Sequence, residues 1–378
     1  MIRILSIASF LGALVLAEAG TAAQETASRL ARLQAALDGV VASDATVFPG
    51  AIVEVSHPEA GTYAVAAGVA DIETNTPLTR AARFRAGSIA KTFVATVALQ
   101  LVEEGRLSLD DTMSALLPED VAARFKNSDR ITLRMLLDHT SGIPEWLSDE
   151  VIGRIAANPA KVWDVQEFLD LAAAHPPAFE PGEGWRYSNT DYNLIGLVIE
   201  RTTGQSWREA VTRRVIEPLG LAGTVLPEPG DTSIPGAFMH GYGMIGGNVV
   251  DLTFIDPSMA GAAGGGALVT TTDDLATFLK ALLAGRLFKD PATLEAMADF
   301  VAAEGEGGRV GYGLGLEKYV LPGGIEMIGH SGGTAGYRSG AFYFPALALS
   351  MTFAMSANDN PLPVIFAALK VMAPDSVP

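Results

Sequence analysis

Apolar residues follow two different spacings along this chain, and each spacing is concentrated in its own part of the sequence. Residues 51–56 and 62–69 are short β-prone runs, and a spacer containing Pro58 and Gly61 separates them, which predicts an antiparallel hairpin. Four runs near the carboxyl end are also strand-like: 311–320, 325–330, 337–344 and 347–355. We therefore expect strands near both ends of the chain.

Helical spacing, with apolar residues three and four positions apart, occupies most of the remainder. Leu30, Leu33 and Leu37 share one face of a predicted amphipathic helix that ends near Gly39. A buried central helix is predicted over residues 88–105. Further helices are predicted over 131–137, 165–174, 191–203, 207–216, 272–284 and 361–372. No run of strands is predicted between residues 107 and 285.

These elements predict an α+β fold, in which both chain ends build one antiparallel sheet that helices flank. A mainly helical region is inserted between the two halves of that sheet. The sheet region would comprise residues 24–106 and 286–378, and the helical region would comprise residues 107–285.

Residues 1–23 are set apart from this domain by their composition. Arg3 precedes the apolar run 4–16, and small residues offer cleavage after Ala19 or Ala23, which is the pattern of a secretory signal peptide. An uncleaved anchor would need about 18 or more apolar residues. We therefore expect a periplasmic or secreted protein with no stable membrane insertion after cleavage.

Composition narrows the classes of function. The chain has 378 residues, of which 49% are hydrophobic, and it contains no cysteine, so disulfides and thiolate metal sites are excluded. Its formal net charge of −17 disfavours binding to nucleic acid or to anionic membranes.

Ser88 and Lys91 form a Ser-x-x-Lys pair at the start of the central helix. Residues three apart share a helix face, so the lysine amine can reach the serine hydroxyl and accept its proton if burial lowers its pKa. The alternative is an ordinary helix start, with Ser88 as the N-cap and Lys91 exposed.

Two other polar stretches could complete such a site. Tyr187-Ser188-Asn189 lies in a predicted loop before a helix, where Asn189 could instead simply cap the helix. The stretch from Gly329 to Gly333 places His330 beside small residues, although it could also be an ordinary glycine turn.

The order Ser-x-x-Lys, Tyr-x-Asn, His-x-Gly resembles that of the penicillin-recognising serine hydrolases. The chain looks most like the soluble D-alanyl-D-alanine carboxypeptidases, class C β-lactamases and related esterases. Supporting matches lie at residues 136–142, 185–190, 266–272 and 311–316, so the resemblance covers about residues 25 to 375. It implies a β-lactamase/transpeptidase-like fold.

The resemblance also implies roles for individual residues. Ser88 would be the nucleophile, Lys91 and Tyr187 the proton-handling pair, and His330 would take the place of a third-motif cation. The backbone N–H groups of Ser88 and Gly333 would form the oxyanion hole. Asn189 and Gly332 would contact the substrate.

The implied reaction is acyl transfer on a small peptide, ester or β-lactam, with no metal and no cofactor required. The resemblance leaves open a β-lactamase-fold esterase and a non-catalytic sensor of cell-wall peptides or penicillins.

Two other hydrolase classes deserve comparison. Residues 329–333 also match Gly-x-Ser-x-Gly, the nucleophile elbow of α/β-hydrolases, but no histidine follows Ser331. A metallohydrolase is disfavoured because the chain lacks His-Glu-x-x-His and its remaining histidines are isolated: His57, His139, His175 and His240. Of these, His139 is a possible support for the site, because it lies in a matched segment.

Charged residues near the predicted site bear on the charge of the substrate. In related carboxypeptidases an arginine can follow the segment that matches residues 311–316, whereas here Glu317 follows it and Lys318 would point to the other face of the strand. An acid would repel a terminal carboxylate, unless Arg338 compensates. We therefore expect weak carboxypeptidase activity and a preference for neutral or cationic esters and amides.

Overall fold

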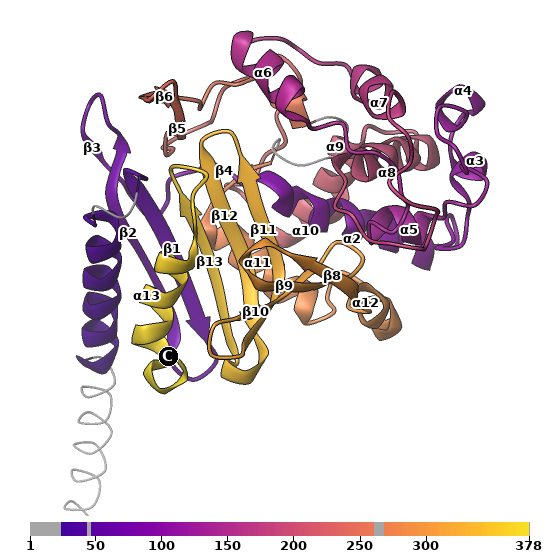
Figure 1. Cartoon of the computed structure of the whole chain (residues 1–378). Helices are drawn as coiled ribbons and strands as arrows, with labels where there is room; N and C mark the ends of the chain where they lie inside the picture. The colour runs from indigo at the N-terminus through magenta and orange to yellow at the C-terminus, as the bar shows by residue number, and fades with distance from the viewer. Residues whose placement is uncertain (1–23, 44–46, 261–267, 378) are drawn as a thin grey trace, which may run out of the picture.

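The computed structural model describes residues 24–43, 47–260 and 268–377, so the predicted signal peptide and the matched residues Gly266 and Ala267 lie outside it. A nine-stranded antiparallel sheet forms the centre, in the order β3-β2-β1-β13-β12-β11-β10-β9-β8 (Figure 1). Its strands are β1 Gly50–His57, β2 Gly61–Asp71, β3 Thr76–Pro77, β8 Val301–Gly305, β9 Arg309–Tyr312, β10 Glu317–Leu321, β11 Ile325–Thr334, β12 Tyr337–Phe344 and β13 Leu349–Met355. Strand β1 pairs with β13, which confirms a sheet built from both chain ends.

One face of the sheet is covered by the helix over residues 24–41 and by α13 (Leu362–Met372) (Figure 1). Leu33 and Leu37 are buried there against the apolar residues of β1 and β2 that face the same side. Leu30 is exposed, and the helix continues past Gly39, so the predicted helix face and end were both slightly wrong.

The opposite face carries α2 (Ala90–Glu103) and the helical region. Phe93 of α2 stacks on Phe278 of α11 at 3.7 Å between ring centroids, which holds α2 against α11, a helix that packs on β13. The other helices are α3 Met113–Leu116, α4 Glu119–Ala122, α5 Leu133–Leu137, α6 Asp149–Ala157, α7 Val165–Ala173, α8 Asn189–Thr203, α9 Trp207–Val211, η2 Thr212–Ile216, α10 Glu217–Leu219 and α12 Pro291–Met297. Helices α2 and α11 themselves span Ala90–Glu103 and Thr272–Leu283, close to the predicted ranges.

The strand predictions needed three corrections. The run 311–320 is two strands, because Gly315 (φ +85) allows a tight turn that lies against Ala95 of α2. No run of strands was predicted between residues 107 and 285, but the described residues there include a hairpin of β5 (Tyr242–Ile245) and β6 (Asn248–Asp251) and the short β7 (Val269–Thr270), which the sequence analysis did not predict. Strand β8 was not predicted.

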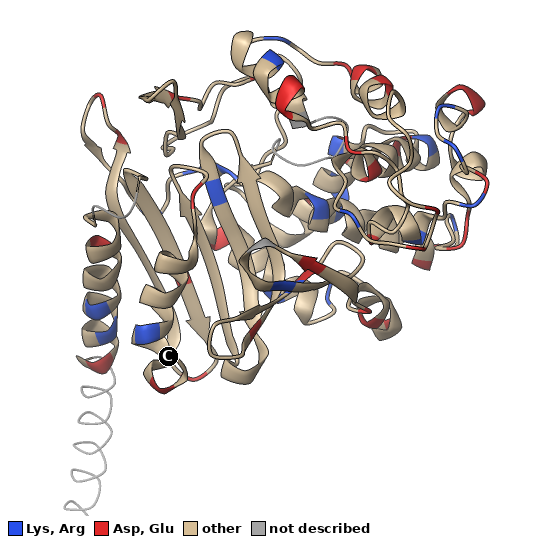
Figure 2. Ribbon diagram, viewed as in Figure 1, with Lys and Arg blue, Asp and Glu red and all other residues tan. Residues whose placement is uncertain are grey.

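Charged residues of both signs are spread over the helical region (Figure 2). Within the described ranges, no helix combines the length and the apolar composition that crossing a membrane would require.

Candidate active site

Ser88 lies in the single turn η1 (Gly87–Ile89) that leads into α2, as the sequence predicted. This turn is pressed against strand β11. A Cβ on Gly332 would lie 1.9 Å from the carbonyl oxygen of Ala86, and a Cβ on Gly87 would lie 2.8 Å from the backbone nitrogen of Gly333. Ser339 Oγ of β12 also donates a 2.8 Å hydrogen bond to the Ala86 carbonyl. Glycines therefore bring the backbone of Gly333 beside the serine turn.

Lys91 is fully buried, one helical turn after Ser88. Its Nζ lies 3.1 Å from Ser88 Oγ and donates a 2.7 Å hydrogen bond to Asn189 Oδ1. Burial lowers the pKa of Lys91 to about 7, although the nearby carboxylates of Glu145, Glu317 and Asp191 partly oppose this shift. The alternative of an exposed lysine is wrong, and this amine can take up a proton near neutral pH.

Tyr187 also contacts Ser88 through a side-chain hydrogen bond. Burial raises the pKa of its phenol well above the ordinary value, and its hydrogen bond with Ser88 acts in the opposite direction. Lys91 Nζ lies 4.8 Å from the centroid of the Tyr187 ring. The phenol is therefore neutral and able to donate or relay a proton, while the lysine is the stronger candidate for the base.

Asn189 begins α8, and Ser188 caps this helix by accepting a hydrogen bond from the Asp191 N–H. The Asn189 side chain is thus free of the capping role and bonds Lys91 instead. Glu145, from the loop before α6, accepts from both the backbone nitrogen and Nδ2 of Asn189, at 2.5 and 3.2 Å. Burial raises the pKa of Glu145, and hydrogen bonds from Leu147 and Asn189 with the charge of Lys91 oppose that.

His330 lies within β11, which continues to Thr334, so the glycine-turn alternative is wrong. Its ring is buried, with Nδ1 2.6 Å from the Ser331 carbonyl oxygen and Nε2 3.0 Å from the Tyr312 hydroxyl. Burial lowers the pKa of His330, which Glu317 only partly opposes. At neutral pH the ring is uncharged, so it donates to the carbonyl and accepts from Tyr312 rather than presenting a cation.

Glu317 is buried beneath the site and is not an isolated acid. Its carboxylate accepts a 2.6 Å hydrogen bond from the Ser331 N–H and lies 3.2 Å from Arg309 Nη1. Burial raises the pKa of Glu317, but His330, the Ser331 N–H and Arg309 outweigh burial and leave it below the ordinary value. The carboxylate is ionised and largely neutralised, so its repulsion of a substrate anion is weaker than the sequence suggested. Lys318 does point away, toward Glu326.

Arg338 follows the turn between β11 and β12 and pairs in register with Gly333. A Cβ on Gly333 would lie 3.3 Å from Arg338 Nη1, so the guanidinium is directed toward the site. Its Nε is buried with no hydrogen-bond partner among the described residues.

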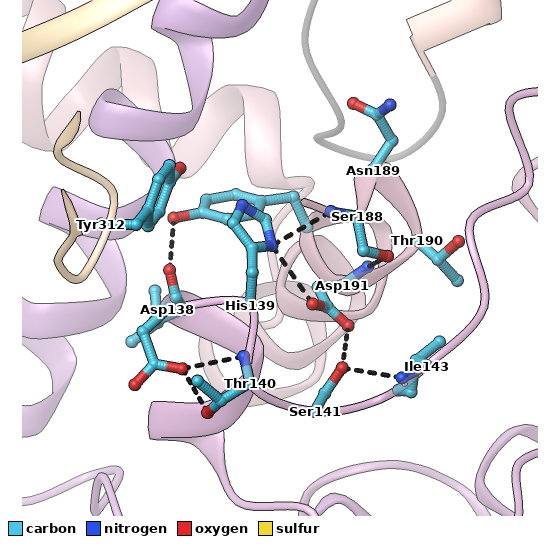
Figure 3. A network of polar contacts seen from close by, with 12 residues as sticks. Asp138, His139, Thr140, Ser141, Ile143, Ser188, Asn189, Thr190, Asp191 and Tyr312 are labelled. Carbon is cyan, nitrogen blue, oxygen red and sulfur yellow. Dashed lines mark hydrogen bonds and ion pairs between the residues drawn. The ribbon is translucent and has the colours of Figure 1, made fainter. Parts of the chain in front are cut away.

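A buried network of polar contacts surrounds His139 and Asp191, next to Ser188 and Asn189 (Figure 3). His139 Nδ1 lies 3.3 Å from the Ser188 nitrogen and 3.2 Å from Asp191 Oδ2, and its ring centroid is 4.6 Å from that of Tyr187. Burial lowers the pKa of His139 well below its ordinary value, so its ring is neutral, and burial raises the pKa of Asp191 well above its ordinary value. His139 has the left-handed backbone angle φ +65. The network fixes the backbone that presents the Tyr-Ser-Asn stretch.

The two rival hydrolase readings find no support in the geometry. Ser331 lies inside a strand that is followed by another strand, so the strand-turn-helix of a nucleophile elbow is absent at this serine. In the part of the chain that the structure describes, His, Asp and Glu side chains form no group of three or more suited to a metal ion.

These residues meet at one large cavity of about 1010 Å³. Its polar end contains Ser88, Tyr187, Asn189, Glu145, Arg309, Glu317, Gly333 and Arg338. His330 does not line the cavity, and neither does Tyr312, to which it is hydrogen-bonded. The arrangement can activate a serine hydroxyl and bring a carbonyl carbon to it.

Fold and site together define a serine hydrolase of the β-lactamase fold. The chain belongs to the family described as beta-lactamase, whose sequence model matches residues 31–370.

Individual relatives cover several activities. The chain is 34% identical over 220 residues to esterase EstB of Burkholderia gladioli, which covers 56% of this chain and 55% of the esterase. It is 28% identical over 294 residues to penicillin-binding protein 4* of Bacillus subtilis, covering 71% of this chain and 60% of that protein. The match thus spans little more than half the length of these relatives.

One solved structure is similar to this chain over a larger part of its length. The D-stereospecific amidohydrolase from Streptomyces sp. superposes with a TM-score of 0.79 at 34% identity, covering 89% of this chain and 98% of that one.

Several residues of the site escaped the sequence analysis. Glu145 follows the matched 136–142 segment by only three residues, so its place beside that segment was a usable signal. Tyr312 lies inside the matched segment 311–316, which was a signal for it. Arg309 precedes that segment and had no such signal, because its approach to Glu317 depends on the pairing of β9 and β10.

Proposed function

We propose that this protein is an amidohydrolase and esterase that works through an acyl-Ser88 intermediate. The observation that carries the proposal is the buried amine of Lys91, 3.1 Å from Ser88 Oγ, with its pKa lowered to about 7. A neutral lysine at that distance can take the serine proton as the oxygen attacks a carbonyl carbon.

The remaining steps use groups of the same cavity. The N–H groups of Ser88 and Gly333 would stabilise the tetrahedral oxyanion, and Asn189 would hold an amide of the substrate. Tyr187 would relay the proton taken up by Lys91 to the leaving amine or alcohol, which leaves the lysine neutral again. Water would then attack the acyl-serine and give a proton to Lys91, which would pass it to Ser88 Oγ as the acid is released. His330 would act indirectly, by orienting Tyr312 and the carboxylate of Glu317.

For the substrate we infer small amides and esters that are neutral or cationic near the scissile bond, with slow β-lactam hydrolysis. Glu145 borders the polar end of the cavity and favours a positive group, whereas Glu317 contributes less because Arg309 largely neutralises its charge. Amino-acid amides are a second candidate, because a free amine would face Glu145, and because the similar Streptomyces enzyme is a D-stereospecific amidohydrolase.

Covalent labelling tests the chemistry. Purified protein should bind a fluorophosphonate or a fluorescent penicillin at Ser88, and release of ester, amide, β-lactam and D-alanine products should be followed in parallel. Turnover of esters and amides supports the proposal. Binding of penicillin without turnover of any substrate would instead support a non-catalytic sensor.

Matched peptides with free and esterified carboxyl ends test the charge preference through kcat/KM. We expect the esterified form to be preferred. A preference of about tenfold or more for the free carboxylate, about 1.4 kcal/mol, would contradict this. Arg338→Ala would then show whether Arg338 binds the carboxylate.

Export is consistent with this function, because an enzyme outside the cytoplasm can reach cell-wall peptides and β-lactams. The proposal of export rests on the sequence pattern of residues 1–23.

A further inference from the structure

Exposed large hydrophobic side chains are concentrated at the cavity of the active site. Six of those in the described part of the chain line it: Val47, Leu147, Ile152, Met244, Ile245 and Val249. Met244 is 59% exposed and Val249 56% exposed, which is costly for side chains of this kind on a water-facing surface. Such a concentration of exposed apolar side chains is typical of a binding surface.

Five of these side chains line the cavity from two elements, which form its two walls. Leu147 and Ile152 belong to the start of α6 and the loop before it, and Met244 and Val249 belong to the β5–β6 hairpin. Both elements lie at the same end of the molecule, beyond the sheet (Figure 1). The deeper lining between the walls is also apolar and includes Leu252 and Ile255. At about 1010 Å³ the cavity is at the upper end of the range for small-molecule sites.

The charge of the β5–β6 hairpin argues against an anionic lipid surface as the partner of these walls. Asp251 is the only charged residue of the two hairpin strands, and the hairpin is drawn almost wholly without charge in Figure 2. With a formal net charge of −17 on the chain and no basic residue in the hairpin strands, an anionic lipid surface would be repelled. A neutral apolar group would not be repelled by this negative charge.

We propose that the apolar walls bind the acyl part of the substrate, so that the enzyme prefers amides and esters of medium-length alkyl or aryl carboxylic acids. This inference rests on the proposed function. Because Ser88 opens into the same cavity, a group bound between the walls can be bonded directly to the carbonyl that Ser88 attacks.

The acyl side is favoured over the leaving group by the continuity of the first wall. That wall begins at Glu145, which is hydrogen-bonded to Asn189, and runs on through Trp146 and Leu147. Asn189 in turn contacts Lys91, the partner of the acylated serine. The acyl group also stays bonded to Ser88 between acylation and hydrolysis of the acyl-serine. Apolar contacts with the acyl group would therefore affect the rates of both steps.

Two isomeric esters provide the test, because ethyl octanoate and octyl acetate have the same composition and differ only in the side that carries the long chain. We expect kcat/KM for ethyl octanoate to exceed that for octyl acetate by at least about tenfold. We also expect kcat/KM to rise along p-nitrophenyl acetate, butyrate and octanoate. Binding of both esters to Ser88→Ala should show the same order without any chemistry.

Surface variants locate the effect. Met244→Ser with Val249→Ser, and separately Ile152→Ser, should each lower the octanoate-to-acetate ratio at least about fivefold. Val162→Ser is the matched control, because Val162 is 52% exposed but does not line the cavity. It should leave the ratio unchanged.

The outcomes separate this inference from the proposed function. Failure of Ser88 labelling and of acetyl-ester turnover would remove the proposed function itself. With turnover intact, any of three results overturns the inference: a higher kcat/KM for octyl acetate, equal kcat/KM values for the two isomeric esters, or an unchanged octanoate preference in the wall variants. A change in mass by light scattering in these variants, with an unchanged ratio, would assign the walls to contact with a second copy of the chain.

Discussion

At the scale of single residues, Ser88 and Ser331 offer a direct comparison, because both line the cavity and each belongs to a serine-hydrolase motif. Ser88→Ala should abolish covalent labelling and lower kcat by at least about 10³-fold, since the nucleophile is lost. Its thermal unfolding should be nearly unchanged, because only one hydroxyl at the cavity surface is removed.

Ser331→Ala is the matched control and should remain active, because Ser331 contributes a hydroxyl contact to Tyr319 and no proton path to Lys91. Peptide mapping by mass spectrometry identifies the acylated serine. An acyl group found on Ser331, or near-native turnover in Ser88→Ala with contamination excluded, would refute the assignment.

The pH dependence of acylation reports on Lys91. Since burial lowers its pKa to about 7 and only the deprotonated amine can accept the serine proton, kcat/KM for a neutral ester should rise with pH through a midpoint near 7. At two pH units below the midpoint the rate should be about 100-fold lower. Lys91→Arg should be inactive throughout, because a guanidinium stays protonated.

A flat profile between pH 5 and 8 in wild-type protein would exclude Lys91 as the base. Stopped assays at each pH, with folding checked by circular dichroism, keep acid unfolding from imitating the effect.

At the scale of elements, the site depends on the close contact of turn η1 with strand β11. Gly332→Ala would place a Cβ 1.9 Å from the Ala86 carbonyl oxygen and 2.4 Å from Ser339 Oγ, so the two elements must separate. We expect a loss of about 1–3 kcal/mol in the free energy of unfolding and a larger proportional loss of kcat/KM, because the oxyanion donors move apart.

Gly153→Ala provides the comparison in α6, where a Cβ would meet nothing within 4 Å. It should raise the free energy of unfolding by about 0.5–1 kcal/mol, since alanine favours the helix. Urea unfolding and kcat/KM measured on both variants decide the matter. Activity of Gly332→Ala within twofold of wild type would show that this contact does not position the site.

At the scale of the whole molecule, the sheet separates the chemistry from the amino-terminal helix. The helix over residues 24–41 and α13 cover the face of the sheet opposite to α2, so residues 1–23 precede an element remote from Ser88. We predict cleavage after Ala19 or Ala23 during export. Amino-terminal sequencing of protein from the native compartment should find Gly20 or Gln24 first, whereas retention of Met1 would refute cleavage.

The sequence by itself determined the features that depend on residues close together in the chain. Period-two and helical spacing located most strands and helices, because burial of one face requires that spacing. The three-residue separation of Ser88 and Lys91 was sufficient to place both on one turn. The three motifs, through their resemblance to a family, named four of the eight residues given for the polar end of the cavity: Ser88, Tyr187, Asn189 and Gly333.

Only the tertiary structure decided which distant groups meet. The ion pair of Arg309 with Glu317, the contact of Glu145 with Asn189 and the direction of Arg338 arise from strand register and loop packing, which leave no periodic mark in the sequence. The neutral state of His330 has the same origin, since the burial that lowers its pKa comes from elements distant in the chain. The apolar walls likewise exist only because α6 and the β5–β6 hairpin line one cavity.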